Sequence, residues 1–286
     1  MNLLGGELQF SLKFIMQKFS VLMSVYHKER PEFLCASLDS VFNQTVMPTE
    51  VVLVEDGPLT LELNTIIEKY CIKYRNLKSV PLKQNQGLGR ALNEGLQHCS
   101  YDLVARMDTD DVCKPNRFEK QLFLFDNHPE IDVCSTWMDE FIGSIDNVQT
   151  VKRLPKNHED LYEYGKKRNP VNHPSVMFRK QAVQLNGNYQ DYPFFEDYFL
   201  WIRMLKYGCK FYCIQESLMY FRSSLDVYKR RGGFKYALTE ARIQFLLYGL
   251  RYINFNRFIK NVVIRFSVRI MPNGLRGFIY RKMRKS

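Results

Sequence analysis

The 286-residue sequence has no long uninterrupted hydrophobic run. A membrane-spanning helix needs roughly 18 or more consecutive apolar residues, whereas the apolar run at residues 245–250 lies between Arg242 and Arg251. Near the N-terminus, Glu7 and Lys13 interrupt the apolar residues and no small-residue cleavage site follows, so a secretory signal is not expected. The chain is therefore predicted not to span a bilayer, and Met16 is an alternative start.

Cysteine patterns typical of disulfide frameworks and zinc sites are also missing. The seven cysteines show no repeated spacing, and Cys209 and Cys213 lack the two-residue gap of a redox or zinc motif. An odd number without a pattern predicts reduced thiols in a cytosolic protein.

Acidic residues are absent from one end of the chain. Residues 251–286 hold ten lysines and arginines and no Asp or Glu, so residues 1–250 hold 31 basic against 30 acidic residues. This asymmetry predicts a near-neutral body and a basic appendage that meets an anionic surface. No recognised nucleic-acid motif accompanies the charge, so a nucleic-acid partner is not expected.

The first half of the chain alternates strand-like and helix-like segments. Strands are predicted at residues 19–25, 51–54, 77–82 and 103–107, with helices at 31–43, 61–74 and 88–98 between them. A helix from Pro115 to about Phe125 and a strand at 131–135 follow, and then helices at 158–167 and 198–206. Alternation of this kind predicts an α/β fold with a mostly parallel sheet flanked by helices.

Carboxylates follow the predicted strands, at the edge of the sheet where parallel sheets bind ligands. Asp108, Asp110 and Asp111 come directly after the fourth strand. Carboxylate oxygens at such a place suit Mn²⁺ or Mg²⁺, although a solvated acidic turn is an equally frequent explanation for such a tetrapeptide. No GxGxxG follows the first strand and no GxxxxGK[ST] occurs, which argues against dinucleotide oxidoreductases and P-loop hydrolases.

A second carboxylate pair, Glu196 and Asp197, precedes an aromatic helix. A partly desolvated carboxylate there has a raised pKa and suits a general base. The alternative is a pair of acids that only stabilises the start of the helix.

Five motifs in order resemble those of the family 2 glycosyltransferases. They are FSVLMSVY at 19–26 with Glu29, VVLVEDG at 51–57, NQGLGRALNEG at 85–95, ARMDTDD at 105–111, and Glu196–Asp197 before an aromatic helix. Within this family, the segment NPVNHPSVMFR at 169–179 resembles the corresponding segment of the small bacterial enzymes that build capsule, exopolysaccharide or O-antigen. The resemblance implies a GT-A fold and a nucleotide-sugar donor.

The same resemblance implies roles for particular residues. Ser24, Tyr26 and Glu29 would hold the nucleoside, and Asp56 would accept from the uracil ring nitrogen. Asp108 and Asp110 match the family's DXD motif, with Asp110 the direct metal ligand, and Asp197 matches the catalytic base.

Other polar residues are predicted to surround the donor and acceptor. Arg106 is expected beside the nucleotide sugar as an organiser of the acids. Trp137 and Asp139 are candidates for the acceptor pocket, although Trp137 could equally belong to the core. Glu196, beside the base, is a further candidate for a contact to acceptor or diphosphate. His173 is either a structural histidine or, with Arg179, a contact to diphosphate.

The C-terminal region is predicted to form a basic amphipathic helix. Phe255, Ile259, Val262, Phe266 and Ile270 recur at helical spacing, with Arg257, Lys260, Arg265 and Arg269 on the opposite side. Such a helix suits an anionic membrane surface, and packing against the body is the alternative. The predicted organisation is an extension at 1–18, a nucleotide-sugar-binding half at 19–112, an acceptor-binding half at 113–227 and a helical membrane-associating region at 228–286.

Together these features predict an inverting, metal-dependent enzyme. The resemblance to the small bacterial enzymes implies that it would move galactose or glucose from a UDP-sugar to a glycan on undecaprenyl diphosphate. It would act as a peripheral protein at the cytoplasmic face of the inner membrane. One inverting step needs a single base, whereas retention through double displacement would need a second, nucleophilic carboxylate. The alternatives are a nucleotidyltransferase acting on sugar phosphates and a non-catalytic sugar-nucleotide or lipid-binding protein.

Overall fold

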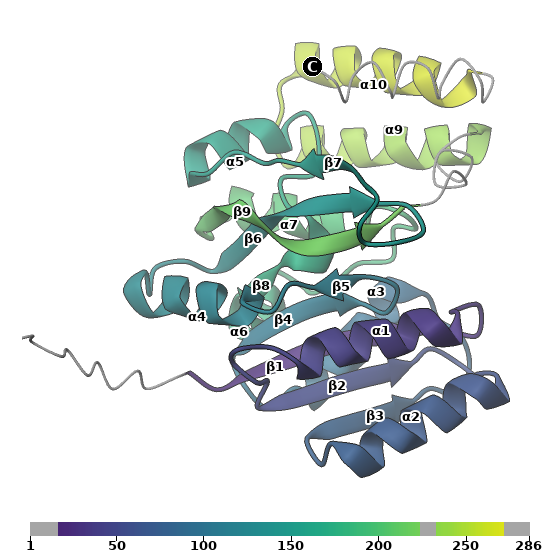
Figure 1. The fold of residues 1–286 in the computed structure, drawn as a ribbon. Helices are drawn as coiled ribbons and strands as arrows, with labels where there is room; N and C mark the ends of the chain where they lie inside the picture. Colours follow the sequence, from purple (N-terminus) through teal and green to yellow (C-terminus); the bar gives the residue numbers. More distant parts are fainter. Residues whose placement is uncertain (1–16, 224–232, 272–286) are drawn as a thin grey trace, which may run out of the picture.

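A mixed β-sheet with helices on both faces forms the body of the molecule (Figure 1). The computed structural model describes residues 17–223 and 233–271, so most of the predicted extension at 1–18 and the basic end at 272–286 lie outside the described residues. The first half comprises β1 (Phe19–Val25), α1 (Pro31–Phe42), β2 (Glu50–Glu55), α2 (Leu61–Lys73), β3 (Leu77–Pro81), α3 (Leu88–His98) and β4 (Leu103–Asp108).

The second half is less regular. Its elements are β5 (Val112–Cys113), α4 (Arg117–Asn127), β6 (Val133–Phe141), β7 (Val148–Lys152), α5 (His158–Gly165), the 3₁₀ turn η1 (His173–Ser175), β8 (Met177–Arg179), α6 (Lys180–Leu185), α7 (Glu196–Lys206), β9 (Phe211–Arg222), α9 (Phe234–Gly249) and α10 (Phe255–Ile270). The predicted strand at 131–135 extends to Phe141. The long strand β9, which pairs with β6, was not predicted.

The sheet order is β3-β2-β1-β4-β8-β6-β9-β5, with β7 paired to β6. Strands β1 to β4 pair in parallel, which confirms the predicted βαβ arrangement. Strand β8 runs antiparallel to β4 and β6, so the direction of the sheet reverses beside β4. The carboxyl ends of β1, β2 and β4 therefore meet at one edge, where the sequence places its acidic residues.

Two apolar layers cover the sheet. Helices α1, α2 and α4 pack on one face, and α3, α6, α7 and α9 on the other. Trp201 of α7 is fully buried in the second layer. Helix α9 contributes Tyr236, Ile243 and Leu247 to this layer, and Tyr252 and Ile253 follow it, so one side of α9 packs on the main core.

Helices α9 and α10 form a hairpin with an ion-pair cluster of Glu240, Arg265 and Arg269 between them. The carboxylate of Glu240, on α9, is 1% exposed and accepts from Arg265 and Arg269 of α10. Asn261 of α10 donates to Gln244 Oε1 at 2.7 Å. The expectation that Arg265 and Arg269 lie on an exposed basic face is therefore wrong, because Glu240 holds both against the body.

The pKa of Glu240 reflects two opposing effects. Burial by itself raises the pKa of a carboxyl, but the ion pairs with Arg269 and Arg265 outweigh this effect and hold it below its ordinary value. Removing this carboxylate would leave two arginines without their buried partner. The ion pairs of Glu240 with Arg265 and Arg269 therefore position α10 on α9.

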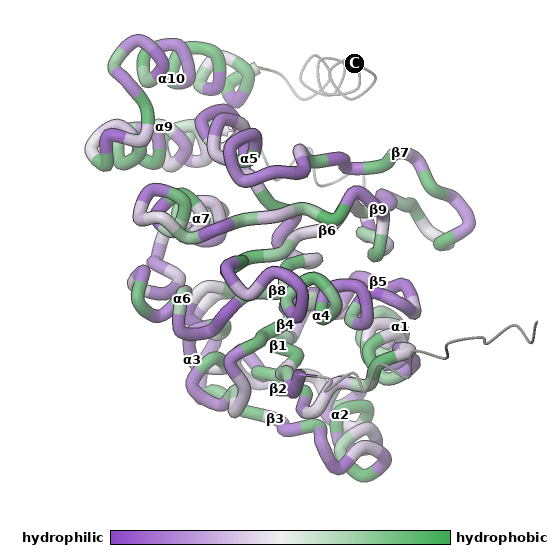
Figure 2. Tube along the Cα trace, turned by 90° about the vertical axis from the view of Figure 1, so that its left-hand side faces the viewer, coloured by the Kyte–Doolittle hydropathy of each residue, from purple (hydrophilic) through white to green (hydrophobic). Residues whose placement is uncertain are grey.

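The outward face of the hairpin is rich in apolar side chains. On α10, Phe255, Ile259, Val263 and Ile270 are 44–59% exposed, and on α9 Phe245 is 63% exposed. Helix α10 is the outermost layer in both views (Figure 2). No helix within residues 17–223 and 233–271 has the length and apolar character needed to cross a membrane.

Candidate active site

Three aspartates meet at the carboxyl end of β4. Carboxylate oxygens of Asp108, Asp110 and Asp111 lie within 4.8 Å of one another. Burial, together with repulsion from Asp108, raises the pKa of Asp110 to about 7, and burial beside Asp110 raises that of Asp111 well above its ordinary value. One oxygen of Asp111, Oδ2, is buried and has no hydrogen-bond partner among the described residues. A divalent cation would relieve this repulsion and complete the partners of these oxygens, so the residues fit a metal site.

Arg106 lies buried beside this cluster, at 1% exposure. Its Nη2 pairs with Asp108, while Nε and Nη1 have no partner among the residues that the structure describes. The ion pair with Asp108 is consistent with the predicted role of Arg106 as an organiser of the acids. Its Nε and Nη1 groups remain available to donate to a ligand.

The residues predicted for the nucleoside lie at the same edge. Ser24 is level with Asp108 in the β1–β4 register. Thr109 Oγ1 donates to Glu29 Oε2 at 2.7 Å, which ties the loop after β1 to the acidic loop. Tyr26 is 39% exposed, as a ring available for stacking would be.

Asp56 is held in a different way from the other acids. Its two oxygens accept from the backbone N–H groups of Gln86, at 2.7 Å, and Gly87, at 3.0 Å, just before α3. Asn85 Nδ2 donates to the Asp56 carbonyl at 3.0 Å. Gly57 has a φ of +86°, and a Cβ there would lie 2.4 Å from Asn85 N, so only glycine fits. The NQGLGRALNEG motif thus anchors the start of α3 to β2, and the contact of Asp56 to uracil stays a prediction.

The second carboxylate pair lies at the first turn of α7, where the helix dipole favours negative charge. Asp197 Oδ2 accepts from Asn169 Nδ2 at 2.6 Å, and its side chain remains 19% exposed. Burial and the neighbouring Asp197 raise the pKa of Glu196 to about 7. Oε2 of Glu196 is buried without a hydrogen-bond partner among the described residues, so it can accept from a ligand.

His173 belongs to the base side of the site. It is 9% exposed, and its Nδ1 lies 3.8 Å from Asp197 Oδ2. Its Nε2 lies 3.1 Å from the Tyr189 hydroxyl, so this nitrogen is already occupied. The structure therefore supports the structural alternative for His173 over a contact to diphosphate through Nε2.

Arg179 does not reach the site. It pairs with Leu103 at the beginning of β4, whereas Asp108 ends that strand. Because β8 runs antiparallel to β4, the end of β8 lies at the opposite edge of the sheet. The guanidinium donates to the carbonyls of Ile131 and Pro129 instead. The expected diphosphate contact from Arg179 is wrong.

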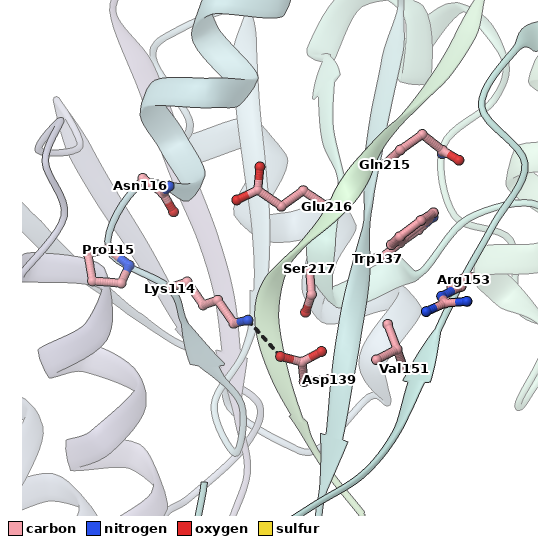
Figure 3. A pocket seen from close by; sticks show the side chains of 10 residues that line it. All are labelled: Lys114, Pro115, Asn116, Trp137, Asp139, Val151, Arg153, Gln215, Glu216 and Ser217. Carbon is pink, nitrogen blue, oxygen red and sulfur yellow. Dashed lines mark hydrogen bonds and ion pairs between the residues drawn. The ribbon is translucent and has the colours of Figure 1, made fainter. Parts of the chain in front are cut away.

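Trp137 and Asp139 line an open pocket of about 700 Å³ between the start of α4 and β7 (Figure 3). Lys114 pairs with Asp139 at 2.6 Å, and the Arg153 guanidinium lies 5.3 Å from the Trp137 ring. None of Asp108, Asp110, Glu196 and Asp197 is among the residues that line it. The assignment of Trp137 and Asp139 to the acceptor pocket stays a prediction.

The sequence gives three residues of the site no distinct signal. Asn169 and Tyr189 contact Asp197 and His173, and Asn93 of α3 exchanges two hydrogen bonds with the backbone of Tyr189. Asn169 and Asn93 do lie in motifs quoted for the family, but their contact partners are 28 and 96 positions away in the chain. Only the folded arrangement reveals them.

Comparison with known proteins identifies the family. The model described as "Glycosyl transferase family 2" matches residues 20–184, more than half of the chain. The chain belongs to glycosyltransferase family 2. It is similar to the Escherichia coli UDP-Gal:alpha-D-GlcNAc-diphosphoundecaprenol beta-1,3-galactosyltransferase, with 41% identity over 93% of this chain and 96% of that protein. It is also similar to the amylovoran biosynthesis glycosyltransferase AmsE of Erwinia amylovora, with 39% identity over 93% of this chain and 99% of that protein.

Solved structures share the fold of this glycosyltransferase. S. aureus TarS has a TM-score of 0.63 at 19% identity, covering 88% of this chain and 43% of that one. The mannosyltransferase PcManGT of Pyrobaculum calidifontis has a TM-score of 0.58 at 16% identity, covering 86% of this chain and 68% of that one. The predicted GT-A fold is confirmed, and so is the prediction that the protein is a glycosyltransferase of the bacterial surface-polysaccharide type.

Proposed function

We propose that this glycosyltransferase moves galactose or glucose from a UDP-sugar to a glycan on a lipid diphosphate, with inversion at the anomeric carbon. The observation that carries the proposal is the pairing of two acidic groups with different surroundings: a three-aspartate cluster beside the nucleoside residues, and Asp197 at the head of α7. The E. coli relative, named for UDP-Gal and a diphosphoundecaprenol acceptor, supports the choice of substrates.

Each carboxylate has a chemical task in this reaction. Asp197 takes the proton from the acceptor hydroxyl as that oxygen attacks the anomeric carbon, and the bond to the donor diphosphate breaks. Glu196 and the two unpartnered nitrogens of Arg106 are available to sugar or phosphate oxygens beside it. One base on the face opposite the leaving group gives inversion.

Mn²⁺ or Mg²⁺ is the cofactor that the aspartate cluster would hold, through Asp110 and Asp108. When bound, such a cation stabilises the negative charge of the departing diphosphate as a Lewis acid. Asp111, which also accepts from the backbone N–H of Arg222 at 2.8 Å, keeps the loop in place.

A panel of nucleotide sugars tests the proposal and its rivals together. The protein is incubated with Mn²⁺, UDP-Gal, UDP-Glc or other donors, and GlcNAc on an alkyl diphosphate. We expect UDP release that requires the acceptor, with a β-linked product from an α-linked donor, as judged by its NMR coupling constant. Pyrophosphate release from a nucleoside triphosphate would instead indicate a nucleotidyltransferase, and donor binding without turnover a binding protein.

We further propose that the outward face of the α9–α10 hairpin attaches the enzyme to the cytoplasmic face of the inner membrane. The apolar side chains of Phe255, Ile259, Val263 and Ile270 on α10 and of Phe245 on α9 are exposed, while the polar side chains of Glu240, Gln244 and Asn261 are buried. The charged side chains of Arg242 and Lys260 are exposed as well. Glu240 offsets one of the two positive charges of Arg265 and Arg269 and holds both side chains against the body. Charge attraction to lipid is therefore weaker than the number of basic residues on α10 indicates, and insertion of the apolar side chains contributes a larger share of the binding.

Substituting Phe255 and Val263 by serine is expected to release the protein from vesicles. A Phe or Val side chain transferred out of water contributes about 1.5–3 kcal/mol when fully buried, so the double variant should bind at least tenfold more weakly. Sedimentation with vesicles of anionic and neutral lipid measures this. The control is Leu61→Ser, which removes an apolar residue of α2 that is even more exposed, at 78% against 57% and 59% for Phe255 and Val263. Binding equal to wild type in the double variant would show that this face is not the anchor.

Truncation is a poorer test of the same surface. Deleting residues 251–286 removes Tyr252, 2% exposed, whose hydroxyl donates to the Tyr162 carbonyl at 2.6 Å. Loss of binding would then be indistinguishable from damage to the core.

A further inference from the structure

Three uncharged side chains from two segments converge on Asp197, and two of them, Tyr189 and His173, form a short chain that ends there. Asn169 Nδ2 lies 2.6 Å from Asp197 Oδ2, and His173 Nδ1 lies 3.8 Å from the same oxygen. The hydroxyl of Tyr189 lies 3.1 Å from His173 Nε2. His173 and Tyr189 are 9% and 4% exposed, so substrate does not reach them directly.

The protonation states of this chain have one consistent arrangement. Burial and the charge of Arg106 lower the pKa of His173 well below its ordinary value, so the imidazole is neutral. Burial raises the pKa of Tyr189, which therefore keeps its proton. If the Tyr189 hydroxyl donates to Nε2, the proton of His173 resides on Nδ1 and faces the carboxylate. The opposite tautomer would direct a lone pair at a negative charge.

The chain is fixed at its far end by α3. The backbone N–H of Tyr189 donates to Asn93 Oδ1 at 2.9 Å, and Asn93 Nδ2 donates to the Tyr189 carbonyl at 2.7 Å. The His173 ring also packs edge-on against Trp201, one turn further along α7 from Asp197, with 5.9 Å between the ring centroids. Tyr189 and His173 therefore have little freedom to move.

Asp197 itself needs such support. Its side chain is 19% exposed at the head of a helix, where a carboxylate can adopt several rotamers. A misplacement of about 1 Å in a reacting group is enough to cost a large factor in rate. The backbone N–H of Tyr198 donates to Oδ1 at 2.7 Å, and Asn169 fixes the other oxygen.

We propose that Asn169, His173 and Tyr189 are positioning residues that hold the Asp197 carboxylate toward the acceptor hydroxyl. Asn169 donates a hydrogen bond to Oδ2, and the ring of His173, oriented by Tyr189, faces the same oxygen at 3.8 Å, so that its N–H dipole favours this position of the carboxylate. None of the three touches donor or acceptor. The inference rests on the proposed role of Asp197 as the base. It gives a function to the NPVNH segment, which supplies Asn169 and His173.

Two single variants and a double-mutant cycle test this inference. Asn169→Ala and Tyr189→Phe are expected to lower kcat about tenfold each, while the Kd of the UDP-sugar, measured by calorimetry, stays unchanged. In an Asp197→Asn background the same changes should have almost no further effect, because the carboxylate that they position is gone. Tyr252→Phe is the matched control: it removes a buried hydroxyl bonded to a backbone carbonyl, and should leave kcat at the wild-type value.

The outcomes separate this inference from the proposed function. A wild-type rate in Asp197→Asn would overturn the base assignment itself. An inactive Asp197→Asn together with wild-type kcat in Asn169→Ala and Tyr189→Phe would overturn only the positioning role. The positioning role would also be overturned if Asn169→Ala and Tyr189→Phe lowered kcat by the same factor in the Asp197→Asn background as in the wild-type enzyme. Such independence from the carboxylate would indicate a general structural effect. Thermal melting checks folding, and Tyr189→Phe, which loses one oxygen, serves if Asn169→Ala does not fold.

Discussion

Replacing Asp197 by asparagine is expected to lower kcat by ~10² or more, because the amide keeps the shape of the side chain but cannot accept a proton. Asn169 could still contact the new amide oxygen, so the local structure should survive. The Kd of the UDP-sugar should change little, since the proposed function assigns binding of the donor diphosphate to the aspartate cluster and not to Asp197. Single-turnover kinetics with labelled donor measure the chemical step directly.

Glu196→Gln is the comparison for this experiment. Glu196 precedes Asp197 and has a raised pKa of about 7, so it is the other carboxyl that could accept a proton near neutral pH. If Asp197→Asn turns over at a near wild-type rate while Glu196→Gln does not, the base is Glu196.

Replacing Asp110 by asparagine is expected to abolish transfer while leaving the fold at least as stable. The three carboxylates repel one another, as the raised pKa of Asp110 and Asp111 indicates, so losing one charge relieves repulsion in the metal-free protein. Stability gained at the expense of activity is typical of a functional site. Thermal melting in EDTA and UDP release in Mn²⁺ measure the two effects.

The control for the metal prediction is Asp126→Asn. Asp126 lies at the exposed end of α4 and accepts from Gln17, away from the cluster, so its loss should change neither activity nor the response to EDTA. Full activity of the wild-type enzyme in EDTA would contradict the metal assignment, and a markedly lower melting temperature in Asp110→Asn would contradict the repulsion argument.

The local sequence pattern was sufficient to predict those parts of the fold that depend on neighbouring residues alone. Strand β1, strand β4 and the acidic residues that follow β4 were predicted because apolar runs end in polar turns, and parallel strands bring those turns to one edge. Arg179 was misplaced because the direction of β8 depends on its pairing with β4 and β6, which no local pattern specifies. Asn169 and Tyr189 could not be assigned because their partners lie far away in the chain.

The charge of α10 illustrates a different limit. Helical periodicity correctly placed Phe255, Ile259 and Ile270 on an exposed side, but it assigns faces from polarity and cannot identify which face has a partner. One buried carboxylate, Glu240, turns Arg265 and Arg269 toward the core. A single complementary charge in a neighbouring helix thus reverses the interpretation of an amphipathic pattern.

The polar interior of the α9–α10 hairpin also has a thermodynamic consequence for membrane attachment. Many amphipathic segments fold only as they bind, and the cost of ordering the chain then reduces their affinity. Here the ion pairs of Glu240 and the bond between Asn261 and Gln244 hold the two helices together before any lipid is met. Attachment through this face would therefore resemble the docking of a rigid body: residues 234–270 gain no helix on binding, and the heat-capacity change arises from buried apolar surface alone.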